Sequence, residues 1–242
     1  MIVGAYLTQN TSWTNVENAL RSLRQARRLS LSGVRRTPLA QLERLIRSAG
    51  YFRQKAQRLK TFVKFLDKRY GGSLSRMFRQ PTEKLREELL ALNGVGPETA
   101  DSILLYGGNH PVFVVDAYTR RILERHQLIS SKASYDEIRE MFEGALAPVA
   151  NEEDGAIVDA ADRTVPGVGI LAATTAGSKA LAAGPPGSCH APSRVSRALR
   201  TARVQVLNEM HGLIVGVGKD YCLKSQMRCE QCPLQKFLPE KS

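Results

Sequence analysis

The sequence predicts an all-α protein, and two observations carry this prediction. Apolar residues recur three or four positions apart through most of the chain, and this spacing places them on one face of a helix. Glycines and prolines separate the periodic segments, and both residues commonly end helices or turn the chain. At 242 residues, the chain is long enough for one large domain or two small ones with ample core.

Five amphipathic segments are expected before the middle of the chain. The clearest runs from Gln54 to Tyr70, with apolar residues at helical spacing and two glycines after its end. Thr82, just beyond Pro81, is the predicted N-cap of the fifth segment. The segments are residues 1–29, 38–49, 54–70, 74–78 and 82–92.

The most informative stretch runs from Leu92 to Arg121 and opens with a two-glycine turn. Gly94 and Gly96 are separated by one apolar residue, which allows a hairpin too tight for side chains. Pro97 suits the first position of the following helix, because its fixed φ and missing N–H cost nothing there. The N–H groups of such a hairpin and helix start point outward and favour an anion.

The helix after the hairpin is expected over residues 98–106, with Gly107 and Gly108 as its stop. A run of four apolar residues, 112–115, then leads directly to Asp116. An acid in this position, in a chain with a net charge of +12, is the first candidate for a functional residue.

Three further helices are expected towards the C-terminus. The first extends to about His126, and the second covers residues 135–146 with Ser134 or Ser131 as its N-cap. The third begins at Ala202 and has the periodic residues Val204, Leu207, His211, Ile214, Val215 and Val217. Between the second and third, residues 151–201 are rich in Ala and Gly and have no aromatic residue, which predicts a flexible insertion.

The charge balance indicates a polyanionic partner. Lys and Arg number 35 against 23 for Asp and Glu, and the isoelectric point is near 9.8. Nucleic acid is the usual partner of such a chain, although a solvated basic surface is the alternative. The most basic stretch contains Arg21, Arg24, Arg27, Arg28, Arg35 and Arg36, which either contact phosphates or form a solvated helix face.

The composition also bears on location. No apolar run approaches the roughly 20 residues of a membrane span, and no signal peptide is evident. Three of the four cysteines lie close together, which is typical of metal ligands or free thiols in a reducing compartment. A cytoplasmic protein is therefore expected, associated with the nucleoid if the source is bacterial.

The hairpin LNGVG, the helix after it and the V-D-x-Y-x-x-R segment ending at Arg121 resemble the helix-hairpin-helix DNA glycosylases of the endonuclease III superfamily. The resemblance covers roughly residues 1–150 and 202–232. It implies two helical lobes with a cleft between them: residues 1–112 with the hairpin, and residues 113–242 with the insertion and a cysteine loop. Family members usually carry a further helix before the point where this chain begins, which leaves the completeness of the second lobe open.

In this family the residue matching Asp116 is the essential carboxylate. Breaking an N-glycosidic bond builds positive charge on the sugar, and a fixed anion stabilises that state more than the neutral substrate. The same carboxylate can orient or deprotonate an attacking water. The alternative is a structural aspartate that caps the next helix, and both roles are compatible.

Glu98 departs from the family pattern. Bifunctional members carry a lysine here, which attacks the sugar, and a carboxylate cannot form that imine. The resemblance therefore implies a monofunctional enzyme, unless Lys219 or another lysine substitutes. A second carboxylate near Asp116 favours a cationic, alkylated base, with mismatched pyrimidines as the open alternative. The alternative is that Glu98 has only a structural role, as an acid in the first turn that complements the helix dipole.

The resemblance also assigns DNA contacts. Gln9, followed by Asn10, matches the loop that fills the gap left by an extruded base, although both residues could simply cap and turn the chain. Tyr51 or Phe52 matches the wedge between base steps, with core packing as the alternative. Trp13 either stacks on the flipped base or anchors the core. The backbone N–H groups of Gly94 and Gly96 and the side chain of Arg120 complete the set.

The cysteine loop matches only part of the family's iron–sulfur motif. Cys222, Cys229 and Cys232 match the first three ligands of a [4Fe–4S] cluster, but the fourth position is Leu238. The alternatives are a vestigial loop held by packing, or a zinc site completed by Cys189 or His190. No cofactor is therefore predicted with certainty.

Together these features predict a monomeric base-excision glycosylase that binds double-stranded DNA with a flipped damaged or mismatched base. The rival hypotheses are a bifunctional glycosylase with lyase activity and a non-catalytic DNA-binding protein that kept the hairpin. The sequence does not identify the excised base.

Overall fold

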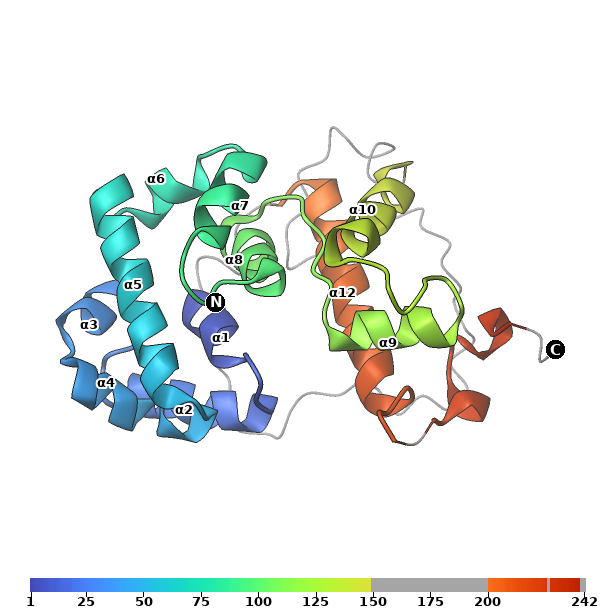
Figure 1. The fold of residues 1–242 in the computed structure, drawn as a ribbon, viewed down its shortest axis with the longest axis horizontal. Coiled ribbons are helices and arrows are strands. Elements are labelled where there is room, and N and C mark those ends of the chain that lie inside the picture. The colour runs from blue at the N-terminus through green and yellow to red at the C-terminus, as the bar shows by residue number, and fades with distance from the viewer. Residues whose placement is uncertain (149–199, 226, 240–242) are drawn as a thin grey trace.

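The computed structural model describes residues 1–148, 200–225 and 227–239, and these residues are helical with no strand (Figure 1). The all-α prediction is confirmed. The helices are α1 (Ile2–Leu7), α2 (Trp13–Gln25), α3 (Leu31–Arg36), α4 (Leu39–Leu45), α5 (Phe52–Tyr70), α6 (Leu74–Phe78), α7 (Thr82–Leu90), α8 (Pro97–Gly108), α9 (Ala117–Arg125), α10 (Tyr135–Ala145) and α12 (Ala202–Asp220). In this part of the chain, no helix is both long and apolar enough to cross a membrane.

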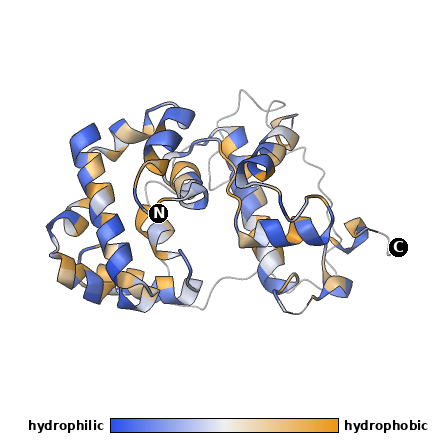
Figure 2. Cartoon of the chain, viewed as in Figure 1, coloured by the Kyte–Doolittle hydropathy of each residue, from blue (hydrophilic) through white to orange (hydrophobic). Residues whose placement is uncertain are grey.

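Figure 1 shows α2 to α7 on one side of the molecule and α9, α10 and α12 on the other, with α1 and α8 towards the middle. Most of these helices carry hydrophilic and hydrophobic residues together, as amphipathic helices do (Figure 2). A single cluster of buried side chains extends from Tyr6 and Phe62 to Leu207 and Ile214. Because the core is continuous, the division into lobes at residue 112 and the cleft between them stay predictions.

The end of α8 differs from the prediction. The helix does not stop at Gly107 but continues through Gly108 and ends at Asn109, which takes the left-handed conformation with φ of 55°. Gly108 is needed for packing instead, because a Cβ there would lie 2.3 Å from the ring of Phe78. The helix end was therefore mispredicted, since tertiary packing rather than termination explains the glycine pair.

The N-cap predictions gave mixed results. Ser134 caps α10 in a capping box with Glu137, as expected. Thr82 is not the cap of α7, because Pro81 holds that position and the Thr82 hydroxyl lies 2.9 Å from Nδ1 of His110. Nearly all of the predicted insertion, residues 151–201, lies outside the described residues.

A buried ion pair joins the helices around the hairpin. Arg86 on α7 donates to both oxygens of the Asp101 carboxylate on α8, at 2.8 and 3.3 Å, and to Asp136 in the first turn of α10 at 2.8 Å. The Asp101 side chain is fully buried; this burial raises its pKa, while Arg86 opposes the increase. The charge of Asp101 therefore depends on Arg86.

We expect Arg86→Met to lower the free energy of unfolding by about 3–5 kcal/mol, because it leaves the Asp101 carboxylate buried without its counter-ion. Urea denaturation of the full chain measures this change. The matched control is Arg35→Met, which breaks a partly exposed pair with Asp67 and should lower the free energy of unfolding far less, because water screens that pair. Equal losses in the two variants would contradict the structural role of the buried pair.

Candidate active site

The two-glycine hairpin connects α7 to α8, and its first glycine is required for two reasons. Gly94 has a φ of 80°, which side chains disfavour, and a Cβ there would lie 2.0 Å from Nε of Arg58. Gly96 precedes Pro97 in an extended conformation and has nothing within 4 Å of its missing Cβ. The guanidinium of Arg58 thus covers the hairpin at Gly94, a contact that the sequence analysis missed.

Gln9 holds the hairpin from the other side. Its amide donates to the carbonyl of Gly94 at 3.0 Å and to the Thr99 hydroxyl at 2.9 Å, and its oxygen accepts from Arg58 at 2.5 Å. The amide therefore links three parts of the chain. The predicted role of Gln9 in an extruded-base gap stays a prediction, and it would require some of these bonds to be exchanged. Asn10 follows as an exposed residue with a φ of 53°.

A buried lysine connects the Gln9 loop to the candidate wedge. The ammonium of Lys55 donates to the carbonyls of Leu7 and Ala49, at 2.9 and 2.7 Å, and burial lowers its pKa. Ala49 lies at the turn before Tyr51, whose side chain is 67% exposed and whose φ is 44°. Phe52 packs against the core instead. Of the two wedge candidates, Tyr51 alone projects into solvent, although its insertion into DNA stays a prediction.

Asp116 is the N-cap of α9, as the structural alternative proposed. Its Oδ1 accepts from the backbone N–H and the hydroxyl of Thr119, at 2.8 and 2.9 Å. Oδ2 takes no part in the cap and faces Nε2 of His211 at 3.6 Å. The cap therefore orients the carboxylate and leaves one oxygen for other chemistry.

His211 was missed as a site residue, because it occupies an apolar position in the periodic pattern of α12. Its ring is buried next to Phe113, and its Nδ1 is hydrogen-bonded to the Tyr106 hydroxyl. Among the described residues, Nε2 has no hydrogen-bond partner, since 3.6 Å to Asp116 exceeds hydrogen-bond length. A polar residue on the apolar face of a predicted helix was the signal available in the sequence.

The two carboxylates of the site have pKa values shifted in opposite directions. Burial acts to raise the pKa of Asp116, but His211 and the Thr119 bonds hold it below its ordinary value. Burial raises the pKa of Glu98, and repulsion from Asp116 adds to the increase, while His211 opposes it. Glu98 remains exposed to solvent, so the protein desolvates its carboxyl group only in part. Asp116 is thus the stable anion and Glu98 the more easily protonated partner.

The V-D-x-Y-x-x-R segment joins α9 to α12. Tyr118 packs closely on Gly218, because a Cβ at Gly218 would lie 2.4 Å from the Tyr118 ring. Arg121 stacks on Tyr118 and donates to the carbonyls of Cys222 and Gly218, at 2.8 and 3.0 Å. These contacts fix α12, and with it His211, relative to Asp116.

Two other site predictions fall on residues with partners inside the chain. Trp13 is 50% exposed and donates to Glu17 at 2.8 Å, so the core-anchor alternative is wrong and base stacking stays a prediction. Arg120 donates to the carbonyl of Ala133 at 2.8 Å while its side chain remains partly exposed. Its phosphate contact also stays a prediction.

The cysteine loop forms one small cavity. The three cysteines line a space of about 120 Å³ together with Leu238, which occupies the fourth position of the motif. A [4Fe–4S] cluster takes four thiolates as a rule, and among the described residues no three His, Cys, Asp or Glu side chains lie close enough together to hold a metal ion. Cys189 and His190 lie outside the described residues, so the cluster and the zinc alternative both stay predictions.

Comparison with known proteins identifies the family of the chain. Residues 3–148 match the family model described as HhH-GPD superfamily base excision DNA repair protein. A Methanocaldococcus jannaschii protein named "Putative DNA repair glycosylase MJ1434" is 48% identical over 148 residues, which cover 60% of this chain and 67% of that protein. Endonuclease III of Thermotoga maritima is 34% identical over 125 residues, covering 52% of this chain and 54% of the relative, about half its length.

One solved structure is similar in both sequence and fold. It is the 3-methyladenine DNA glycosylase MagIII of H. pylori bound to 1,N6-ethenoadenine. The identity is 30% and the TM-score is 0.57, with 64% of this chain and 72% of that chain covered.

We expect Glu98→Gln to raise the melting temperature near neutral pH. The pKa of Glu98 is higher in the folded chain than its ordinary value of 4.5, so its ionised form destabilises the fold above the folded pKa. The gain should disappear as the pH falls and Glu98 becomes protonated. Thermal unfolding between about pH 4 and about pH 7.5 measures this, with Glu87→Gln on the exposed face of α7 as the control. A gain of equal size at both ends of this range would contradict the raised pKa of Glu98.

Proposed function

The chain belongs to the HhH-GPD superfamily of base excision DNA repair proteins and is a DNA glycosylase, and we propose that it removes the base by hydrolysis alone, without a lyase step. The observation that carries the proposal is the carboxylate pair at the start of α8 and α9. Asp116 is held ionised, and Glu98 occupies the position at which bifunctional members carry the attacking lysine.

Asp116 supplies the charge that the reaction needs. As the glycosidic bond breaks, the sugar becomes cationic, and a preorganised anion stabilises this state more than the neutral nucleotide. The Thr119 bonds fix Oδ1, so Oδ2 is the oxygen that can face the sugar or orient a water molecule. Tyr106 holds His211 against the same oxygen, which restricts the directions that Oδ2 can take.

Glu98 favours a cationic substrate. Burial is the main cause of the raised pKa of Glu98, and repulsion from Asp116 adds to it; a positively charged ring near the two carboxylates would relieve that repulsion. A ring-alkylated purine carries such a charge and also leaves the sugar readily. We therefore assign an alkylated base as the substrate class. The sequence identity of 30% to the H. pylori 3-methyladenine DNA glycosylase supports this choice.

DNA is the partner, held at the hairpin through the backbone N–H groups near Gly94 and Gly96. Gln9 and Tyr51 stand at two turns that the buried Lys55 joins, so the gap-filling residue and the wedge are positioned together. Opening the duplex would then place the flipped base near Asp116, with one copy of the chain sufficient for the reaction.

Asp116→Asn should abolish most base removal while retaining DNA binding. Asparagine caps a helix about as well as aspartate, so the fold is expected to persist. Loss of the charge and of general-base assistance should lower the single-turnover rate by at least about 100-fold. The measurement uses duplexes that each carry one alkylated or mismatched base.

The control for this variant is Glu124→Gln on α9, which should keep the wild-type rate. Wild-type removal of mismatched pyrimidines only would overturn the alkylated substrate class. Absence of base removal by the wild type on every duplex would instead support the rival non-catalytic DNA-binding protein.

Borohydride should trap no covalent adduct between the wild-type chain and damaged DNA, because no lysine occupies the position of Glu98. Lys219 lies eight residues beyond His211 on α12, about 12 Å along the helix axis, and is exposed. Glu98→Lys is the positive control, since it restores an amine at this position and should yield a trapped adduct. A substantial wild-type adduct that disappears in Lys219→Ala would establish the bifunctional alternative.

A further inference from the structure

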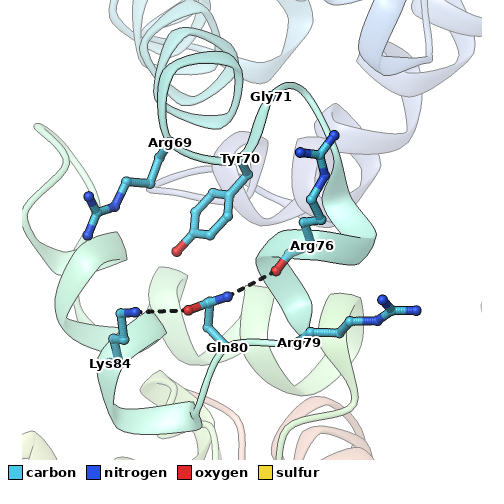
Figure 3. A pocket seen from close by; sticks show the side chains of 7 residues that line it. All are labelled: Arg69, Tyr70, Gly71, Arg76, Arg79, Gln80 and Lys84. Atoms are coloured by element: carbon cyan, nitrogen blue, oxygen red, sulfur yellow. Dashed lines mark hydrogen bonds between the residues drawn. The ribbon is translucent and has the colours of Figure 1, made fainter.

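A basic hollow lies at the end of α5 opposite Tyr51. It has a volume of about 530 Å³, and its walls include Arg69, Tyr70, Arg76, Arg79, Gln80 and Lys84 (Figure 3). The 19 residues of α5 separate the two ends by about 27 Å. The hollow is therefore far from the wedge, and none of its residues belongs to the site around Asp116.

The charge in the basic hollow is largely uncompensated. Four of its lining side chains are cationic and none is a carboxylate. The nearby Glu88 is already engaged, because Arg69 donates to it at 3.1 Å and the Tyr70 hydroxyl is bonded to its other oxygen. Among the residues that the structure describes, Arg76, Arg79 and Lys84 form no ion pair.

Local contacts involve two of these residues, Arg76 and Lys84. The Gln80 amide donates to the carbonyl of Arg76 at 3.3 Å, and its oxygen accepts from the Lys84 ammonium at 2.9 Å (Figure 3). A Cβ at Gly71 would lie 3.3 Å from the Arg76 guanidinium, so the bare backbone there gives the guanidinium its room. Cations from α5, α6 and α7 thus line one hollow, and the Gln80 amide binds the ammonium of Lys84 among them.

We propose that the basic hollow binds phosphate groups of the DNA backbone, outside the stretch held at the hairpin. Arginine and lysine are the usual phosphate ligands, and the cationic side chains here are exposed, as a strand passing over the surface requires. A small-molecule site would instead be enclosed and mostly apolar. The inference rests on the proposed function only for the identity of the polyanion, because it concerns binding and not base removal.

The test compares the salt dependence of DNA binding in the full chain and in the double variant Arg76→Ala/Arg79→Ala. On an undamaged duplex of about 40 base pairs, the slope of log K against log salt should become shallower by about 1.8, for two lost phosphate contacts. On a duplex of about 12 base pairs with the damaged base at its centre, each arm extends only about 20 Å from the wedge, less than the length of α5, so the slope and the single-turnover rate should not change.

The matched control is Lys64→Ala/Lys68→Ala, which removes two exposed charges from α5 without touching the basic hollow. An equal change in slope for both double variants would show general electrostatics and overturn the proposal. An unchanged slope on the duplex of about 40 base pairs would also overturn the proposal. If inorganic phosphate then stabilised the wild type but not the variant, the basic hollow would be a site for free phosphate instead. Failure of base removal, with the expected change in slope, would refute the proposed function alone.

Discussion

The buried carboxylate of Asp101 is the constraint on which the arrangement of the site depends. Arg86 on α7 neutralises this carboxylate. The Tyr135 hydroxyl lies close to it: burial raises the pKa of Tyr135, and the charge of Asp101 raises it further. The same hydroxyl accepts from the backbone N–H of Val115, next to Asp116, at 3.2 Å. A charge without water is tolerated only when its partners are fully in place. The hairpin helices, α10 and the segment before Asp116 are therefore held in one arrangement.

Within that arrangement, the site combines structural and chemical roles in the same groups. Asp116 caps α9 with one oxygen and presents the other, so the stability of the helix and the orientation of the carboxylate have one cause. Glu98 works against stability, because burial disfavours its ionised form and repulsion from Asp116 adds to this effect. Such a conflict is typical of catalytic sites, where a group is kept in surroundings that favour the substrate rather than the fold.

The loops around the hairpin are held by polar contacts to backbone carbonyls. Gln9 and Arg58 secure Gly94, and Lys55 binds the carbonyls that precede the Gln9 loop and the Tyr51 turn. These bonds keep the exposed parts of both loops at defined positions before any ligand binds. The basic hollow at the far end of α5 extends the positive surface beyond this region, so the cationic excess of the chain is not confined to the hairpin.

The sequence by itself determined the features that depend on local chemistry. Helical spacing predicted α5 and α12, and the positive φ of Gly94 follows from the two-glycine turn. The sequence offered Ser134 or Ser131 as the cap of α10, and the structure has Ser134. Asp116 and Glu98 were found because motif spacing fixes their place on the chain.

Only the tertiary structure showed what surrounds these groups. His211 lies 95 positions from Asp116, and Arg58 lies 36 positions from Gly94. Nothing in the local pattern of either residue indicates its partner, and Gly108 was misinterpreted because Phe78 packs on it from another helix. Backbone conformation is set mainly by neighbours in sequence, whereas burial, charge pairing and pKa depend on groups that meet only when the chain folds.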